Sequence, residues 1–265
     1  MNPLKRIMER RIAEAGSQNE KEATESSLSL VFRDDIKTLK SIEGTPRKVQ
    51  FKKDRIDHYL PFVNGVIDSD DGRDSVIVSY MLVWAMDVGN YAEVEKIASY
   101  MLKHGLGFPD SLMRASVSTF IARELVAHAP TGSISDDEIL SLFGLLVYES
   151  NDISSLRDMA DAVRKELLVL IARTRRKTMW EGEPNYEEVN GLYAAAIASG
   201  ASIKGEYRDF AKEVGEKLKE KADESKDLAL YKNALDYLKV AEEQGASLKK
   251  IIDEVDSAIA ELSKS

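Results

Sequence analysis

Apolar residues recur every three or four positions along most of this chain. Leu28, Phe32, Ile36, Leu39 and Ile42 form one such run, and the spacing places them on a single stripe of a helix. Alternating runs rich in Val, Ile and Thr, which are typical of strands, are almost absent. The pattern therefore predicts an all-α, multi-helix protein built from antiparallel helical hairpins.

Residues 83–110, "VWAMDVGNYAEVEKIASYMLKHGLGFPD", have the pattern of a helical hairpin. The first helix is expected to end near Gly89, and the second to run from Tyr91 to His104. Glycine readily adopts the left-handed conformation that ends many helices, so both glycines of this stretch suit helix ends. Upstream, "EGTPR" at 43–47 interrupts the apolar stripe, and a shorter helix is expected to follow it through Tyr59.

Downstream of the hairpin the same pattern predicts three further helices, the second of which follows a capping motif and runs through Tyr148. One helix is expected over 110–129, with Asp110 or Ser111 as its N-cap. "SDDE" at 135–138 has the sequence of a capping box, in which the first and last side chains each bond the other's backbone amide. A long helix is expected from about residue 153 to residue 178.

The last part of the chain predicts a repeat. "YEEVNGLYAAAIASGASIK" at 186–204 aligns with "YKNALDYLKVAEEQGASLK" at 231–249 at a constant offset of 45 residues. In each "GAS", the Gly is expected to end one helix and the Ser to cap the next. The pattern favours a repeat-like, TPR-like carboxyl-terminal part. The alternative is that any helix of this length that starts with Tyr and ends at Gly gives the same match.

These breaks divide the chain into four expected segments. Residues 1–27 form a mobile, basic and polar amino-terminal segment, and 28–59 a basic helical segment. Residues 60–179 form a central helical core, and 180–265 a repeat-like domain of helical hairpins.

Composition narrows the functional classes. The chain has 265 residues, of which 43% are hydrophobic and 31% charged, and it contains no cysteine. Disulfides, thiolate metal sites and cysteine nucleophiles are therefore excluded, and a reducing compartment fits. No apolar run reaches the roughly 18 residues of a membrane-spanning helix, so no membrane partner is expected.

Charge is distributed unevenly along the chain. The net charge is −9, yet residues 1–60 hold 13 Lys or Arg against 10 Asp or Glu. Residues 36–55 hold seven basic residues against two acidic ones: Lys37, Lys40, Arg47, Lys48, Lys52, Lys53 and Arg55. A solvated helix face would carry more compensating acids, so these seven are the candidate DNA-binding residues. A possible second basic patch is Arg173, Arg176 and Lys177, although cations near a helix end also suit the helix dipole.

We find no catalytic constellation in the sequence. The three histidines, at 58, 104 and 128, are too scattered for a metal site. The acidic stretch "DSDDGRD" at 68–74 lacks the glutamate that closes a twelve-residue calcium loop, because Ser79 occupies that position. The phosphate-binding G-x-x-x-x-G-K motif is missing too. We therefore expect no catalytic residues, no metal and no cofactor.

Three stretches carry a family resemblance: "LPFVNGV" at 60–66, "MLVWAMDVGNYAEV" at 81–94 and "YMLKHGLGFPD" at 100–110. They resemble the small-subunit family of tailed-bacteriophage terminases, in the branch from temperate, contractile-tailed phages with cohesive genome ends. The strongest signature is "W-x-x-D-x-G" followed by a helix and "HGL-x-x-P". Its positions are Trp84, Asp87, Gly89, His104, Gly105, Leu106 and Pro109.

The resemblance implies a role in viral genome packaging. Small subunits of this family recognise the packaging site on double-stranded viral DNA, assemble into homo-oligomeric rings and recruit the large subunit, which carries the ATPase and nuclease. It also implies action in the host-cell cytoplasm, outside the mature virion. In this branch the subunit is often labelled an endonuclease subunit, but the residues favour a non-catalytic partner. The alternatives are a helical-repeat protein-binding scaffold without DNA binding, and a metal-dependent endonuclease subunit.

Overall fold

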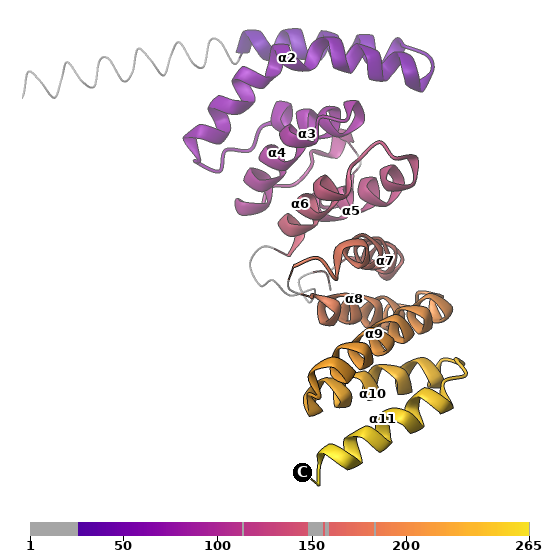
Figure 1. Cartoon of the computed structure of the whole chain (residues 1–265). Helices are drawn as coiled ribbons and strands as arrows, with labels where there is room; N and C mark the ends of the chain where they lie inside the picture. The colour runs from indigo at the N-terminus through magenta and orange to yellow at the C-terminus, as the bar shows by residue number, and fades with distance from the viewer. Residues whose placement is uncertain (1–25, 113, 148–155, 157–158, 183, 265) are drawn as a thin grey trace, which may run out of the picture.

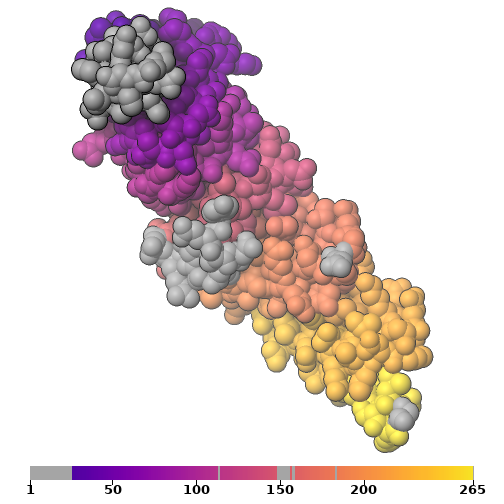
Figure 2. Space-filling model, turned by 90° about the vertical axis from the view of Figure 1, so that its left-hand side faces the viewer, coloured from indigo at the N-terminus to yellow at the C-terminus, as the bar shows by residue number. Residues whose placement is uncertain are grey.

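The computed structural model describes residues 26–264 except 113, 148–155, 157–158 and 183. Helices make up the regular structure of the described residues, and no strand occurs among them, so the all-α prediction is confirmed. The helices stack in chain order into an elongated body (Figure 1). Figure 2 shows the same elongation from the side, with the amino-terminal helices at one end and α11 at the other. The segment expected at 1–27 lies almost wholly outside the described residues.

The amino-terminal end contains the predicted hairpin. Residues 26–41 are helical, followed by α2 (Thr45–Ser69), α3 (Val76–Val88) and α4 (Tyr91–Lys103). Gly89 ends α3 in the left-handed conformation with φ of 74°, and the side chain of Asn90 caps α4. The hairpin prediction is therefore confirmed, with α4 ending one residue before His104.

Helix α2 is longer than expected. The break at "EGTPR" is confirmed, since the chain leaves the helix after residue 41 and starts again at Thr45. The helix then continues past Tyr59 to Ser69, although Pro61 lies inside it. Pro61 removes one backbone donor, but Tyr59, Val63 and Val66 are all 0% exposed, and burial of this stripe outweighs the loss.

The middle of the stack begins with two short turns and three helices: η1 (Asp110–Leu112), α5 (Val117–His128), η2 (Ala129–Thr131), α6 (Asp136–Leu146) and α7 (Asp161–Thr178). The expected helix start at Asp110 or Ser111 is wrong, because α5 begins at Val117 with Ser116 accepting a bond from the Thr119 amide. The capping box of Ser135 and Glu138 is confirmed. Helix α7 starts at Asp161, later than expected, and most of 153–158 lies outside the described residues.

The carboxyl-terminal part contains α8 (Tyr186–Ala198), α9 (Lys204–Ser225), α10 (Leu228–Glu243) and α11 (Lys249–Leu262). Gly200 and Gly245 both adopt the left-handed conformation, with φ of 90° and 97°. The expected serine caps are wrong: α9 and α11 start one residue later, after Ile203 and Leu248, and neither start has a side-chain cap. A left-handed glycine ends many unrelated helices, so the shared shape of the two turns does not test whether the two hairpins are repeats. The repeat stays a prediction.

One hydrophobic core runs through the whole stack, from Phe32 in the first described helix to Val255 in α11. Helices α9 and α10 are closely packed at Gly215, whose missing side chain makes room for Leu238. None of the described helices combines the length and the hydropathy that crossing a bilayer requires.

Candidate nucleic-acid interface

The seven predicted DNA-binding residues do not share one face. Lys37 and Lys40 lie on the helix at 26–41, and the other five lie on α2. On α2, residues spaced by three, four or seven positions face the same way. Lys52 lies four positions before the fully buried Ile56 and seven before Tyr59, so it points toward the core, whereas its neighbour Lys53 is exposed.

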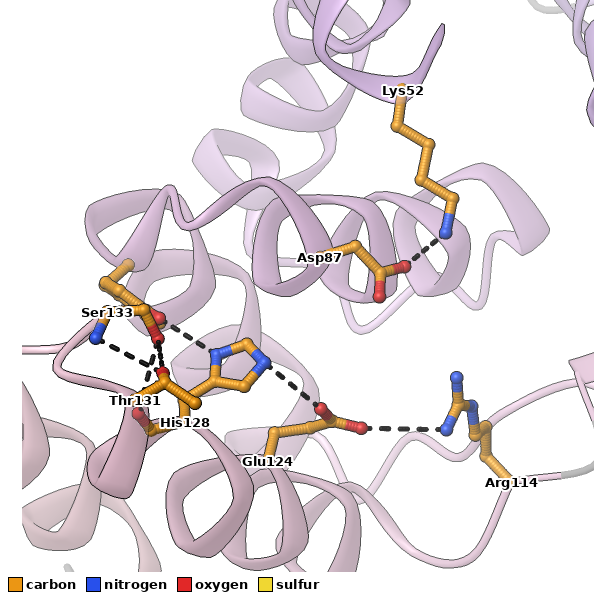
Figure 3. Close-up of polar contacts among 8 residues, drawn as sticks. Lys52, Asp87, Arg114, Glu124, His128, Thr131 and Ser133 are labelled. Carbon is orange, nitrogen blue, oxygen red and sulfur yellow. Dashed lines mark hydrogen bonds and ion pairs between the residues drawn. The ribbon is translucent and has the colours of Figure 1, made fainter. Parts of the chain in front are cut away.

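Lys52 forms an ion pair with Asp87 of α3, which Figure 3 shows beneath α2. The side chains of Lys52 and Asp87 are 14% and 31% exposed. Asp87 is the acidic residue of the "W-x-x-D-x-G" signature. The charge of Lys52 is therefore used within the protein, where it holds α2 against α3.

Arg55 is also paired, at the junction of α2 with the helix at 26–41. Its guanidinium lies 3.5 Å from Asp35, which is 5% exposed. The Tyr59 hydroxyl donates a 2.6 Å hydrogen bond to the same carboxylate. Burial, and then this hydrogen bond, raise the pKa of Tyr59 well above its usual value. Asp35 thus fastens the first described helix to α2.

The remaining candidates present positive charge to solvent. Lys40, Arg47 and Lys53 are exposed and form no ion pair within the described part of the chain. Lys48 is half-buried, and Lys37 pairs with the neighbouring Asp34 at 3.0 Å, with both side chains more than 70% exposed. Such an exposed pair is weak and can be exchanged for a ligand phosphate.

An aromatic cluster supports these two basic helices from below. Trp84 of α3 is 1% exposed, and its ring lies 6.1 Å from Phe32, 6.0 Å from Tyr59 and 6.3 Å from Phe51, measured between ring centroids. These three rings come from the helix at 26–41 and from α2. Trp84 is therefore the apolar anchor of the whole basic segment.

The possible second basic patch is fully engaged by acidic side chains. Arg173 binds Glu206 through two nitrogens, at 2.9 and 2.7 Å, Arg176 lies 2.8 Å from Glu213, and Lys177 lies 2.7 Å from Asp136. The hydrogen bond from Arg173 lowers the pKa of the Glu206 carboxyl. These pairs connect α7 to α9 and α6. The arrangement matches a structural task for the three cations, and their DNA contact stays a prediction.

Acidic side chains at the end of α2 are already bonded to neighbouring groups of the protein. Asp70 pairs with Lys103 and, at 2.7 Å, with His104 of the "HGL" signature. These hydrogen bonds, that of Lys103 first, lower the pKa of Asp70. Asp71 accepts a bond from the Arg73 amide at 3.0 Å. Within the described residues, no group of three or more His, Cys, Asp or Glu side chains is arranged to hold a metal ion.

The structure reveals a further polar cluster that sequence reasoning missed. His128 contacts the Tyr91 hydroxyl at 2.9 Å and Glu124 at 3.6 Å, and Glu124 lies 3.7 Å from Arg114 (Figure 3). The spacing of Glu124 and His128 by four residues in one helix was a visible signal for one of these contacts. The others join residues far apart in the sequence.

The region that contains the basic helices and the signature hairpin matches a known family. The family model described as "Phage small terminase subunit" matches residues 30–162, which is half of the chain. The chain belongs to the phage small terminase subunit family. No solved structure matches it.

A curated relative of this small terminase subunit is the "Terminase, endonuclease subunit" of Escherichia phage P2. The two are 32% identical over 133 residues, which are 50% of this chain and 52% of the relative. The chain thus spans about half the length of the curated relative in the match. The family region starts at residue 30, so it includes all seven amino-terminal DNA-binding candidates, whereas the second basic patch lies beyond it.

The signature residues of this small terminase subunit serve the fold. Trp84 and Asp87 hold the basic helices, and His104 fixes the end of α2 through Asp70. Gly105 ends the hairpin with φ of 62°. The residues that identify the family therefore hold the candidate interface in place. The exposed cations are not part of this sequence pattern.

The Lys52–Asp87 pair is expected to contribute measurably to stability. A double-mutant cycle with Lys52→Ala and Asp87→Ala should give a coupling energy of about 1–2 kcal/mol, because both side chains are largely shielded from water. The matched control is the exposed Lys37–Asp34 pair, which should couple by less than about 0.5 kcal/mol. Urea unfolding measures both, and equal coupling energies would contradict the proposed role of Asp87.

Proposed function

We propose that this small terminase subunit recognises packaging-site DNA through its amino-terminal helices and takes no catalytic part in cleavage. The observation that carries the proposal is the exposure of Lys40, Arg47 and Lys53 on the amino-terminal helices of a protein whose net charge is −9. Lysine and arginine side chains that meet phosphates release condensed counterions, which is the main source of affinity for duplex DNA.

The same proposal includes two protein partners. In the host cell during packaging, the subunit forms a homo-oligomeric ring and recruits the large subunit, which supplies the ATPase and the nuclease. The family membership supports this role, and the charge distribution fits it. The basic end would face DNA, while the acidic remainder, with 24 Lys or Arg against 36 Asp or Glu after residue 60, is suited to protein contacts.

Reversing three exposed cations tests the DNA contact. The variant Lys40→Glu, Arg47→Glu, Lys53→Glu should bind duplex DNA carrying the packaging site about 10–100-fold more weakly at ~100 mM salt. The slope of log affinity against log salt should fall by about three, one for each lost phosphate contact. Fluorescence anisotropy over a salt series measures both quantities. Lys52 is left in place because its reversal would set two carboxylates against each other at Asp87.

The matched control changes the net charge equally at the other end of the stack. Lys232→Glu, Lys239→Glu, Lys250→Glu alters three exposed residues of α10 and α11. It should leave affinity nearly unchanged, apart from a small long-range effect that salt screens. Equal losses in the two variants would show that only net charge matters, and an unchanged amino-terminal variant would remove these helices as the DNA contact.

The unaltered chain and the same variants also distinguish the proposed function from two alternative functions. A helical-repeat scaffold that binds only proteins would give no salt-dependent DNA binding in any variant. A metal-dependent endonuclease, suggested by the name of the P2 relative, would cut DNA when Mg²⁺ or Mn²⁺ is added to the isolated chain. That activity should then be lost in Asp71→Asn, because Asp71 lies in the acidic stretch at 68–74.

A further inference from the structure

The solvent-facing side of α2 carries a regular series of polar side chains. Arg47, Gln50 and Lys53 are all exposed and follow one another at intervals of three residues. With 3.6 residues in each turn, a step of three residues moves the side chain by about 60° around the helix axis, so Gln50 lies midway between the two cations. Tyr59, which is 0% exposed, comes about two and a half turns after Gln50. Gln50 therefore points directly away from the core.

The amide of Gln50 is held in one orientation. Its Nε2 atom donates a 2.7 Å hydrogen bond to Oδ1 of Asp54, which lies one turn further along α2. An ionised carboxylate only accepts hydrogen bonds, so the nitrogen of the amide must be the atom that faces Asp54. The Oε1 atom and the second N–H of Gln50 bond no other side chain among the described residues. They present one acceptor and one donor side by side to solvent.

The charges on this face of α2 have an order. Arg47 and Lys53 lie on its two flanks and form no ion pair within the described part of the chain, whereas the exposed Asp54 and Asp57 project into the sector between them. A helix lying along one phosphate strand would bring these two carboxylates against phosphates. A helix in the major groove turns its flanks to phosphates and its middle to base edges, where cytosine amino groups can donate to a carboxylate.

The shape and support of α2 also fit the major groove. A helix with its side chains is about 10–12 Å across, and the groove is about 12 Å wide. Figure 1 shows α2 at the amino-terminal end of the stack, with α3 on its inner side. From that inner side, Trp84 packs against Phe51 and Tyr59 of α2. A helix fixed in this way presents its outer side chains in a defined geometry.

We propose that α2 enters the major groove of the packaging site and that Gln50 recognises an adenine there. The inference rests on the proposed function, because it assigns the base discrimination of that DNA contact to one residue. Adenine presents an acceptor, N7, beside a donor, the N6 amino group, and these match the free N–H and the Oε1 atom of Gln50. Arg47 and Lys53 contact phosphates on either side, and Asp54 is a positioning residue that orients the amide.

The test exchanges the base preference of α2. The full chain selects duplexes from a pool with a randomised segment, and sequencing gives the preferred base at each position. The unaltered chain should prefer adenine at one position, where Gln50→Arg should prefer guanine, because arginine donates to guanine O6 and N7. Gln50→Ala should lose the preference at that position alone, with discrimination lowered by about 5–100-fold. Gln50 is exposed, so these variants should keep the fold.

Asn233→Arg is the matched control for the added charge. It replaces another exposed amide by the same cation, on α10 and far along the stack from α2 (Figure 1). This variant should select the same sequence as the unaltered chain.

Asp54→Ala tests the positioning role. Affinity for arbitrary duplexes should rise, because one carboxylate is removed from the DNA-facing side. The preference for adenine should fall by about 2–10-fold, since the freed amide of Gln50 must be ordered on binding. Asp54 acting only on stability or net charge would not change these two quantities in opposite directions.

The outcomes separate this inference from the function on which it rests. If the unaltered chain selects a sequence and both Gln50 variants select the same one, the role of Gln50 is overturned and DNA recognition stands. A preference that Gln50→Ala loses at a guanine would overturn the adenine assignment. If the unaltered chain binds duplexes without any preference, base recognition is overturned and the phosphate contact remains. If it binds no duplex, the proposed function and this inference are both overturned.

Discussion

Replacing Trp84 with alanine is expected to lower the free energy of unfolding by about 3–5 kcal/mol. The indole is 1% exposed, and it packs against rings from both basic helices. Alanine would leave a cavity that Phe32, Phe51 and Tyr59 cannot fill without moving α2. Urea unfolding followed by circular dichroism gives the loss.

The DNA affinity of Trp84→Ala should fall as well, even though Trp84 cannot reach DNA. Loosening α2 and the helix at 26–41 from α3 spreads Lys40, Arg47 and Lys53 over many positions, so binding must first restore their order. Trp180→Ala is the matched control, because Trp180 is only half-buried and is partly covered by Lys217 and Lys221. It should cost about 1–2 kcal/mol and leave DNA binding unchanged. Equal effects of the two substitutions would contradict the anchoring role of Trp84.

Replacing Gly215 with leucine should destabilise the carboxyl-terminal helices by about 3 kcal/mol or more. A Cβ atom at this position would lie 2.7 Å from Cγ of Leu238 and 3.1 Å from its backbone nitrogen. A flexible side chain could turn away, but the backbone of α10 cannot. Helices α9 and α10 would therefore have to separate along their contact.

The same substitution at Gly191 should change the stability in the opposite direction. Gly191 is exposed on α8, and nothing lies within 4 Å of a Cβ built there. Leucine should stabilise that helix by up to about 1 kcal/mol, since glycine is a poor helix former. Thermal unfolding of the two variants measures the contrast. A stabilised Gly215→Leu would mean that α9 and α10 are not packed this closely in solution.

The sequence predicted the local structure where local chemistry decides it. The hairpin of α3 and α4 and the capping box of Ser135 were predicted correctly, because a left-handed glycine and a capping pair act within a few residues. The length of α2 was not predicted. A proline inside a helix is unfavourable by itself, and only burial of the stripe around Tyr59 compensates for it.

The candidate interface was predictable in composition but not in orientation. The excess of cations in residues 36–55 is visible in the sequence. The inward direction of Lys52 is not, because its partner Asp87 lies 35 residues away in the chain. The second patch shows the same limit. Its three cations follow the expected helical spacing, but the carboxylates that engage them come from other helices, which only the tertiary structure brings near.

The position of α7 has a mechanical consequence. Most of the packing between the family-matched helices and the last four helices passes through this one element, which touches α5 and α6 on one side and α8 on the other. Two groups of helices that are joined by one shared helix can open locally and independently of each other. A ligand bound along α7 would restrict the motion of this helix and couple the motions of the two groups of helices. Hydrogen exchange of α7 would then report on communication between the two ends of the molecule.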